Sequence, residues 1–294
     1  MKSSFYICAS FVVTLGLTIS ADAENGSGNT ALFQRQLSGD TAWTYRETGE
    51  DDTAVPLQPR SWHLDYEDCD GDSQSPINLS VPHITPVRMK KFGLAFSPKT
   101  CPSRNHIYLQ SNHNWEIDFE ACLENEDTAS SLRFDGDFYE LQQMHIHTPS
   151  EHTFGGGEED GEMHFVHENT DGSGRLLVVG VLLSSSLDYG DNLELQPYWD
   201  RIAGTSEEPF SASPYDLLPA DPSYFYYEGS LTTPPCSEIV SWILMTNPVK
   251  VSSLQIQNFR RSVQLYEGSA VSESGNTNRP AQLLNGRTIY FVTP

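Results

Sequence analysis

Five of the nine histidines of this 294-residue chain lie between residues 141 and 170, in the stretch LQQMHIHTPSEHTFGGGEEDGEMHFVHENT. Such a concentration of imidazoles could be a metal site, a set of buried polar residues or surface decoration. His145 and His147 are separated by one residue, and alternate side chains of a strand point to the same face. In a strand their Cα atoms would be roughly 7 Å apart, close enough for both imidazoles to bind one ion.

A third histidine can join this pair if the chain turns back on itself. The run GEMHFVHE is typical of a second strand, in which Glu162, His164 and Val166 share one face. The connection FGGGEEDG is short and glycine-rich, so we expect an antiparallel, hairpin-like return that brings His164 beside the first pair. Three neutral imidazoles with a fourth position open to water are typical of a catalytic zinc site, although cobalt or copper could use the same ligands. Spacing alone does not distinguish such a site from three histidines that are hydrogen-bonded polar residues of a sheet.

The elements that must position these histidines are mostly strands. Beyond Trp43 the chain consists of short β-leaning runs separated by turn residues, with no linker, repeat or low-complexity block. The run RLLVVGVLL is apolar on both faces, which predicts a strand at the centre of the sheet. Helical periodicity is clearest over residues 252–266, where a serine can cap the first turn. The sequence therefore predicts a mainly β domain with a few short helices, of a length that suits one all-β unit.

The first 23 residues have the features of a secretory signal peptide. A basic start precedes a short apolar run, and small residues at Ala21 and Ala23 form an A-x-A exit. The run is short for a membrane span, and no second long apolar run follows. We therefore expect cleavage near Ala23, a flexible polar lead-in over residues 24–40 and no membrane span in the mature chain. The mature protein would be secreted or extracytoplasmic, either periplasmic or extracellular.

Charge and cysteine content bear on partners and compartment. The formal net charge of −23 argues against nucleic acid or an anionic membrane as a partner. Cys8 would leave with the signal peptide, and an even number of cysteines in an exported chain suggests two disulfides. Three connectivities are possible among the four that remain, which are Cys69, Cys101, Cys122 and Cys236. None of them forms a C-x-x-C pair, which disfavours a thiolate zinc site or thioredoxin-like chemistry.

Several ordered motifs resemble a known family. The runs HIHTPSEHT, EMHFVH and SLTTPPCSEIVSWIL, together with SQSPINL and NRPAQ, strongly resemble the α-class carbonic anhydrases over about residues 41–292. The resemblance implies a single catalytic domain over residues 41–294, built around a large, mostly antiparallel central sheet. It also implies a secreted zinc enzyme that hydrates carbon dioxide reversibly to bicarbonate and a proton through zinc-bound hydroxide. Carbon dioxide, bicarbonate and water would then be its small-molecule partners; the sequence gives no oligomeric partner.

The family's zinc ligands fall on His145, His147 and His164 of this sequence. By resemblance, Gln143 supports the imidazole of His145 and Glu162 supports that of His164, since such partners fix the tautomer and orientation of a ligand. Each supporting residue has the same strand parity as its histidine, so both can reach the shared face. The remaining two histidines of the stretch, His152 and His167, do not match ligand positions and are expected to be structural or surface residues.

The resemblance assigns further roles around the metal. Thr232 matches a threonine that orients the hydroxide, Glu151 matches its carboxylate partner, and Thr233 would line the substrate pocket. His113 matches the proton shuttle, for which an imidazole with a pKa near neutrality is suited. Tyr45 resembles a tyrosine of the water network. Four apolar residues would form the wall that receives carbon dioxide: Val166, Val178, Leu231 and Trp242.

The cysteines, too, match exported members of the family. The resemblance implies that Cys69 pairs with Cys236, which leaves Cys101 and Cys122 to pair with each other, remain free or form intermolecular bonds. Two departures from many members are Glu159, at an aromatic position, and Thr148, at the position of a tryptophan in many animal enzymes.

Two Asn-X-Ser sequons, at Asn25 and Asn78, could carry glycans in a eukaryotic host; packing could hide the second. A catalytically silent binding or mineralisation-associated ectodomain is the alternative function. Such relatives typically lose zinc histidines, whereas all three are present here.

Overall fold

The computed structural model describes residues 43–45, 57–88, 92–102, 106–110, 114–123, 127–202, 211–265, 271 and 274–294. The predicted signal peptide, the lead-in over residues 24–40, Asn25 and His113 lie outside these ranges. Among the described residues, no helix is both long and apolar enough to cross a membrane.

The described strands form one large sheet and two small ones. The large sheet has 12 strands, with the order β2-β16-β13-β14-β11-β10-β8-β6-β5, while β15 pairs with β11, and β7 joins β3 to β8. Most neighbouring pairs are antiparallel, as expected, but β11 pairs in parallel with both β14 and β15, and β16 pairs in parallel with β2. The bounds are β2 Ile84–Arg88, β3 Leu94–Ser97, β5 His106–Gln110, β6 Asn114–Asp118, β7 Ser131–Phe134, β8 Asp137–His147, β10 Gly161–Asn169, β11 Leu176–Ser186, β13 Tyr224–Gly229, β14 Val240–Met245, β15 Val249–Ser252 and β16 Ile289–Thr293.

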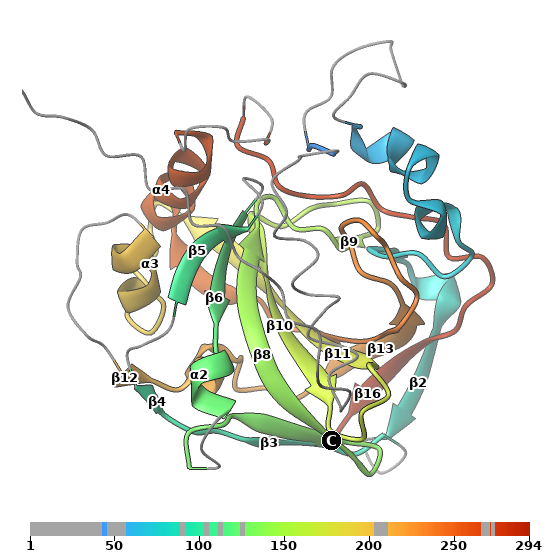
Figure 1. Cartoon of the computed structure of the whole chain (residues 1–294), viewed down its shortest axis with the longest axis horizontal. Helices are drawn as coiled ribbons and strands as arrows, with labels where there is room; N and C mark the ends of the chain where they lie inside the picture. The colour runs from blue at the N-terminus through green and yellow to red at the C-terminus, as the bar shows by residue number, and fades with distance from the viewer. Residues whose placement is uncertain are drawn as a thin grey trace, which may run out of the picture.

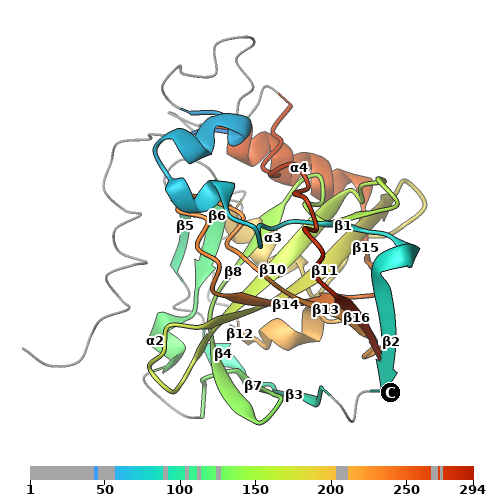
Figure 2. The ribbon, with the colours of Figure 1, turned by 90° about the vertical axis from the view of Figure 1, so that its right-hand side faces the viewer.

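The long strands β8, β10 and β11 run side by side through the middle of the molecule, and helices lie at its periphery (Figures 1 and 2). The small sheets pair β1 (Asn78–Leu79) with β9 (Thr153–Phe154) and β12 (Ser211–Ala212) with β4 (Cys101–Pro102). Among the described residues, the α-helices are α2 Glu120–Leu123, α3 Gln196–Ile202 and α4 Ser253–Gln264; 3₁₀ helices cover Pro59–Leu64, Glu67–Asp70, Val81–His83 and Pro214–Leu217. The mainly β prediction is confirmed.

Helix α4 begins where its sequence predicts. Ser252 is the N-cap: its side chain accepts a hydrogen bond from the backbone N–H of Gln255, and the Gln255 side chain accepts one from the backbone N–H of Ser252. The buried residues Ile256, Phe259 and Val263 follow a helical period and attach one face of α4 to the core. The expected helix over residues 252–266 is therefore confirmed, with bounds that differ by one residue at the start and two at the end.

Strand β11 is central, because apolar residues cover both of its faces. Leu177, Val179 and Val181 belong to one buried cluster, whereas Leu176 and Val178 belong to a second cluster on the opposite face. This alternation follows from the two-residue period of a strand. The doubly apolar run thus lies at the middle of the sheet, between the histidine-bearing strand β10 and the parallel strand β14.

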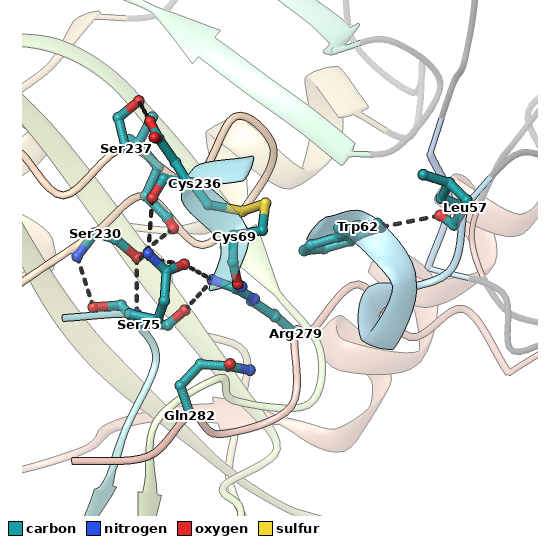
Figure 3. The surroundings of a disulfide bond; sticks show 12 residues. Leu57, Trp62, Cys69, Ser75, Ser230, Cys236, Ser237, Arg279 and Gln282 are labelled. Atoms are coloured by element: carbon teal, nitrogen blue, oxygen red, sulfur yellow. Dashed lines mark hydrogen bonds between the residues drawn. A yellow bond between two sulfur atoms is a disulfide. The ribbon is translucent and has the colours of Figure 1, made fainter. Parts of the chain in front are cut away.

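Both disulfides are present in the structure. Cys69 is bonded to Cys236 across 167 residues, and Cys101 is bonded to Cys122 across 21 residues. The first bridge joins the 3₁₀ helix at Glu67–Asp70 to the segment that follows the TTPP turn (Figure 3). The buried guanidinium of Arg279 donates a hydrogen bond to the carbonyl of Cys69 at 3.1 Å, so this bridge is part of a larger polar anchor.

Candidate active site

Three histidines from two adjacent strands meet on one face of the sheet. His145 and His147 are at the end of β8, and His164 on β10 is directly opposite His145 in the antiparallel register, as the hairpin-like return predicted. Their ring centroids are 4.9, 5.1 and 4.7 Å apart. One nitrogen from each ring lies within 4.8 Å of the others, which is the arrangement of a three-imidazole metal site.

The second nitrogen of each ring is occupied by an acceptor. Nδ1 of His145 is 2.7 Å from Oε1 of Gln143, Nε2 of His164 is 2.8 Å from Oε1 of Glu162, and Nδ1 of His147 bonds to the main-chain carbonyl of Thr277. Each of these nitrogens therefore carries the hydrogen, and the other nitrogen of each ring directs a lone pair to the centre. Nε2 of His147 is buried without a hydrogen-bond partner among the described residues, which fits a metal ligand.

Burial keeps these imidazoles neutral. It lowers the pKa of His147 to about 4, and it lowers the pKa of His145 well below the usual value, helped by the two neighbouring imidazoles. The pKa of His164 is also lowered by burial, although Glu162 opposes the shift. A neutral imidazole is the form that binds a metal, so the site is ready to bind one at neutral pH.

Glu162 is the centre of the hydrogen-bond network behind His164. Burial would raise the pKa of this carboxyl, but interactions with His152 and His164 outweigh burial and hold the pKa well below its usual range. Oε2 accepts hydrogen bonds from the backbone N–H groups of Glu151, at 3.0 Å, and His152, at 2.8 Å. A Cβ atom at Gly180 would lie 2.9 Å from Oε1, so glycine on β11 leaves the space that this carboxylate needs.

Glu151 lies beside the metal-facing nitrogens: its Oε2 is 3.5 Å from Nε2 of His147 and 4.0 Å from Nδ1 of His164. Glu151 is buried, and its Oε1 accepts a hydrogen bond from the backbone N–H of Arg279 at 2.8 Å. Burial raises the pKa of Glu151 to about 7, against the opposing effects of His164, Arg279 and the Thr232 hydroxyl. Tyr45 is buried close by, and burial together with Glu151 raises its pKa well above the usual value, so its hydroxyl stays protonated.

Most of the predicted site residues line one pocket. The expected apolar wall comes largely from three adjacent strands, since Val166 on β10 is opposite Val178 on β11, and Val178 is in register with Trp242 on β14. Glu151 and Glu162 are buried but do not line the pocket. The lining residues are Trp43, Tyr45, Asn114, Gln143, His145, His147, His164, Val166, Val178, Leu231, Thr232, Thr233 and Trp242.

Comparison with known proteins assigns the chain to a protein family. A family model described as eukaryotic-type carbonic anhydrase matches residues 57–293. The chain belongs to this family. It is 31% identical over 255 residues to a carbonic anhydrase of Klebsiella pneumoniae, covering 84% of this chain and 89% of that protein. It is also 31% identical over 275 residues to carbonic anhydrase 7 of Homo sapiens, covering 86% of this chain and 98% of the human protein.

A solved structure agrees with these relatives. The alpha-carbonic anhydrase of Thermovibrio ammonificans, in complex with the inhibitor sulfanilamide, superposes with a TM-score of 0.65 and 27% identity, covering 84% of this chain and 98% of that one. Carbonic anhydrases of this type are zinc enzymes, and the three imidazoles of the pocket fit that cofactor. A carbonic anhydrase with a zinc site on a mostly β fold is therefore what both sequence and structure support.

The two other histidines of the 141–170 stretch, His152 and His167, are structural. His152 is buried, with Nδ1 2.7 Å from Oε1 of Glu162 and Nε2 2.6 Å from the hydroxyl of Tyr227. His167 is also buried, and its ring contacts the carbonyl of Leu177 and the hydroxyl of Tyr215. The sequence left open whether these two histidines are structural or surface residues, and their burial shows that they are structural.

Some residues of the site have no assigned role from sequence. Thr277 and Arg279 act through main-chain groups, on His147 and Glu151 respectively. Arg279 is in the NRPAQ motif and Thr277 is next to it. The motif supported the resemblance to the family, but it did not predict what either residue does in the site. Asn114 and Trp43 line the pocket without a spacing pattern that would have singled them out.

Proposed function

We propose that this chain catalyses the reversible hydration of carbon dioxide to bicarbonate and a proton at the pocket of His145, His147 and His164. The observation that carries the proposal is the convergence of three imidazole nitrogens whose opposite ring nitrogens all bond to acceptors. When bound, Zn²⁺ supplies a nucleophile at neutral pH by lowering the pKa of a coordinated water to about 7, an effect for which this enzyme family is the standard example.

Thr232 and Glu151 would orient the attacking oxygen. A threonine hydroxyl has one hydrogen, so a hydroxyl that donates to the Glu151 carboxylate can only accept from a solvent molecule beside it. The solvent hydrogen is then directed at Thr232, and a lone pair is left facing the substrate. The backbone N–H of Arg279, 2.8 Å from Oε1 of Glu151, fixes the carboxylate that Thr232 needs as its acceptor.

The apolar wall would hold carbon dioxide, which has no polar hydrogen to donate. Val166, Val178 and Trp242 are buried and line the pocket with Leu231, next to the imidazole of His164. The ring of Trp242 is 4.8 Å from that of His164, so the wall adjoins the ligand cluster directly. Thr233 lines the same pocket and would contact bicarbonate through its hydroxyl.

A proton must leave the pocket in each hydration cycle, and we assign its transfer to His113, with Tyr45 holding part of the water path. An imidazole with a pKa near 7 can accept and release a proton at the pH of the reaction. Tyr45 lines the pocket with a protonated hydroxyl, so it can donate to ordered water without competing for the proton.

The chain is also proposed to be exported, with residues 1–23 as a signal peptide and residues 41–294 as the catalytic domain. Two disulfides support this assignment, because such bonds persist in oxidising compartments. Asn78 of the second sequon is exposed, and its Oδ1 accepts hydrogen bonds from Thr153 and the N–H of Gly156. Packing therefore does not hide this side chain, and a glycan at Asn78 would be compatible with the fold.

The decisive experiment is stopped-flow carbon dioxide hydration by the protein purified after expression of the full chain, with its zinc content measured. We expect rapid hydration that is lost in His164→Ala and retained in His83→Ala, which removes an exposed histidine away from the pocket. A folded, zinc-loaded protein without hydration activity would overturn the proposal and favour a catalytically silent binding module.

A further inference from the structure

The residues before and after His147 are each held by a hydrogen bond from the side chain of a distant residue to their main chain. The carbonyl of Ile146 accepts a hydrogen bond from Nδ2 of Asn114 at 2.7 Å. The N–H of Thr148 donates to Oγ1 of Thr277 at 3.1 Å. All four of these contact residues are buried. The main chain around one ligand is thus fixed on both sides by distant parts of the sequence.

The side chain of Asn114 bonds to β8 where the backbone pairing of β6 with β8 has ended. Backbone pairing between β6 and β8 covers Glu116 to Asp118 and ends opposite His145. Beyond that point the Asn114 carboxamide, rather than a backbone N–H, bonds to the edge of β8. The oxygen of the same carboxamide accepts from the N–H of Trp115 at 2.9 Å, so both of its ends bond to main chain.

Thr277 acts on the other side through all three of its polar atoms. Its N–H donates to the carbonyl of Thr148 at 3.0 Å, its Oγ1 accepts from the N–H of Thr148, and its carbonyl accepts from Nδ1 of His147. Thr277 is fully buried and belongs to no helix or strand. Its position therefore depends on the same bonds that it makes to the end of β8.

His147 needs this support because it is the last residue of β8. A ligand at the end of a strand has ladder neighbours on one side only, and a metal site tolerates little freedom in its ligands. We infer that Asn114 and Thr277 are positioning residues for His147, and that they set the zinc affinity of the site. This inference depends on the metal site of the proposed function, but not on its reaction.

The test compares zinc dissociation constants, measured by chelator competition, and the visible absorption of the cobalt-substituted protein. Asn114→Leu keeps a branched side chain without a donor, and Thr277→Val replaces only the hydroxyl of a β-branched side chain by a methyl group. We expect each to raise the zinc dissociation constant about 10-fold, as partners outside the ligand shell commonly do, and to change the cobalt spectrum. Thr277→Ser restores the hydroxyl and is expected to restore both readouts.

A neighbouring variant provides the matched control. Trp115→Phe removes the indole N–H that donates to Oγ of Ser262 on α4 at 2.9 Å, and it leaves the Asn114 bond in place. We expect this variant to lose some stability but to keep the zinc dissociation constant and cobalt spectrum of the wild type. If Thr277→Val does not fold, Asn114→Leu decides, because it acts from the opposite side of His147.

Two results separate this inference from the proposed function. Variants that are less stable without metal but bind zinc and cobalt like the wild type would overturn the positioning role, whatever the activity. A wild type that binds zinc but does not hydrate carbon dioxide would overturn the proposed reaction and leave the positioning role intact. A wild type without tight zinc binding would overturn both.

Discussion

His152 and His164 share a single carboxylate oxygen, since Oε1 of Glu162 is 2.7 Å from Nδ1 of His152 and 2.8 Å from Nε2 of His164. Because a carboxylate only accepts, both rings donate, and Nε2 of His152 must accept from the hydroxyl of Tyr227. That hydroxyl in turn is 2.9 Å from Oγ of Ser75. A buried chain of hydrogen bonds therefore runs from a zinc-ligand candidate to the SQSPINL segment and fixes the tautomers of both imidazoles.

The first prediction concerns Glu162→Gln. The amide oxygen of glutamine can still accept from a ring, but its NH₂ group would face the N–H groups of Glu151 and His152, which now donate to Oε2. We expect the zinc dissociation constant to rise about 10- to 100-fold, because the support of His164 is weakened. Chelator competition measures this constant, and Glu158→Gln, at an exposed glutamate of the same segment, should leave it unchanged.

A second prediction concerns the stability that the same chain of buried hydrogen bonds contributes. Tyr227→Phe leaves Nε2 of His152 and the hydroxyl of Ser75 without their buried partner, at a cost of about 1–3 kcal/mol in the free energy of unfolding. Denaturant unfolding measures the loss. Tyr226→Phe, whose hydroxyl bonds to the exposed Glu228, should cost less. Equal losses in the two variants would contradict a stabilising role for the buried chain.

Much of this arrangement follows from strand parity. Gln143 has the parity of His145 and Glu162 that of His164, so each pair was expected on one face, and each forms a hydrogen bond there. The position of β11 was equally predictable, because a run that is apolar on both faces must be covered on both. These features depend only on neighbours in sequence or on the period of a strand.

Other features depend on contacts that leave no mark in the residue types. Thr277 is 130 residues from His147, and it bonds to that ring through a carbonyl that every residue possesses. Parallel pairing of β11 with β14 and β15 joins strands that are far apart along the chain, and the pattern of each strand is compatible with either direction. The burial of His152 and His167 was also open, since a polar residue in a loop or a strand can face solvent or a buried partner.

The apolar wall gives a third prediction, on substrate access. Val178→Phe places a larger ring in the wall next to the ligand histidines, and kcat/KM for carbon dioxide hydration should fall by roughly 100-fold, since small displacements of a reactant cost that much. Zinc affinity should stay at the wild-type value, because Val178 bonds to no ligand. Val178→Ala leaves the wall open and should cost far less; an equal loss would indicate that the fold, not access, is affected.

The two disulfides should differ in their contribution to stability. Replacing both cysteines of a pair by serine removes the loop constraint, and the entropy of loop closure grows with the logarithm of loop length. With separations of 167 and 21 residues, 1.5RT ln(167/21) makes the Cys69–Cys236 bridge more stabilising by about 1.8 kcal/mol. Denaturant unfolding of the two double variants tests the difference. A greater loss on removal of Cys101–Cys122 would contradict the loop argument.

The last prediction concerns pH and His167. This histidine is buried on one face of β10, and its neighbour Val166 lies on the other face. Its Nδ1 is 3.2 Å from the carbonyl of Leu177, which can only accept, so Nδ1 carries the hydrogen and Nε2 accepts from the hydroxyl of Tyr215 at 2.7 Å. Burial lowers the pKa of this imidazole from 6.5 to about 3, against the opposing hydrogen bonds to main-chain groups. The folded protein therefore holds His167 neutral in a pH range where the unfolded chain binds a proton.

The sign follows from proton counting. Between pH 6.5 and about 3 the unfolded state binds the extra proton, so the free energy of unfolding should decrease as the pH falls through this window, by up to about 1.4 kcal/mol per pH unit from this group. The ligand histidines contribute in the same direction in metal-free protein, so the informative quantity is the difference between wild type and His167→Gln. That difference should shrink as the pH is lowered to about 3, because glutamine does not titrate. Urea unfolding of both proteins at a series of pH values measures it, and parallel pH profiles would show that His167 gains its proton as easily in the folded state as in the unfolded chain.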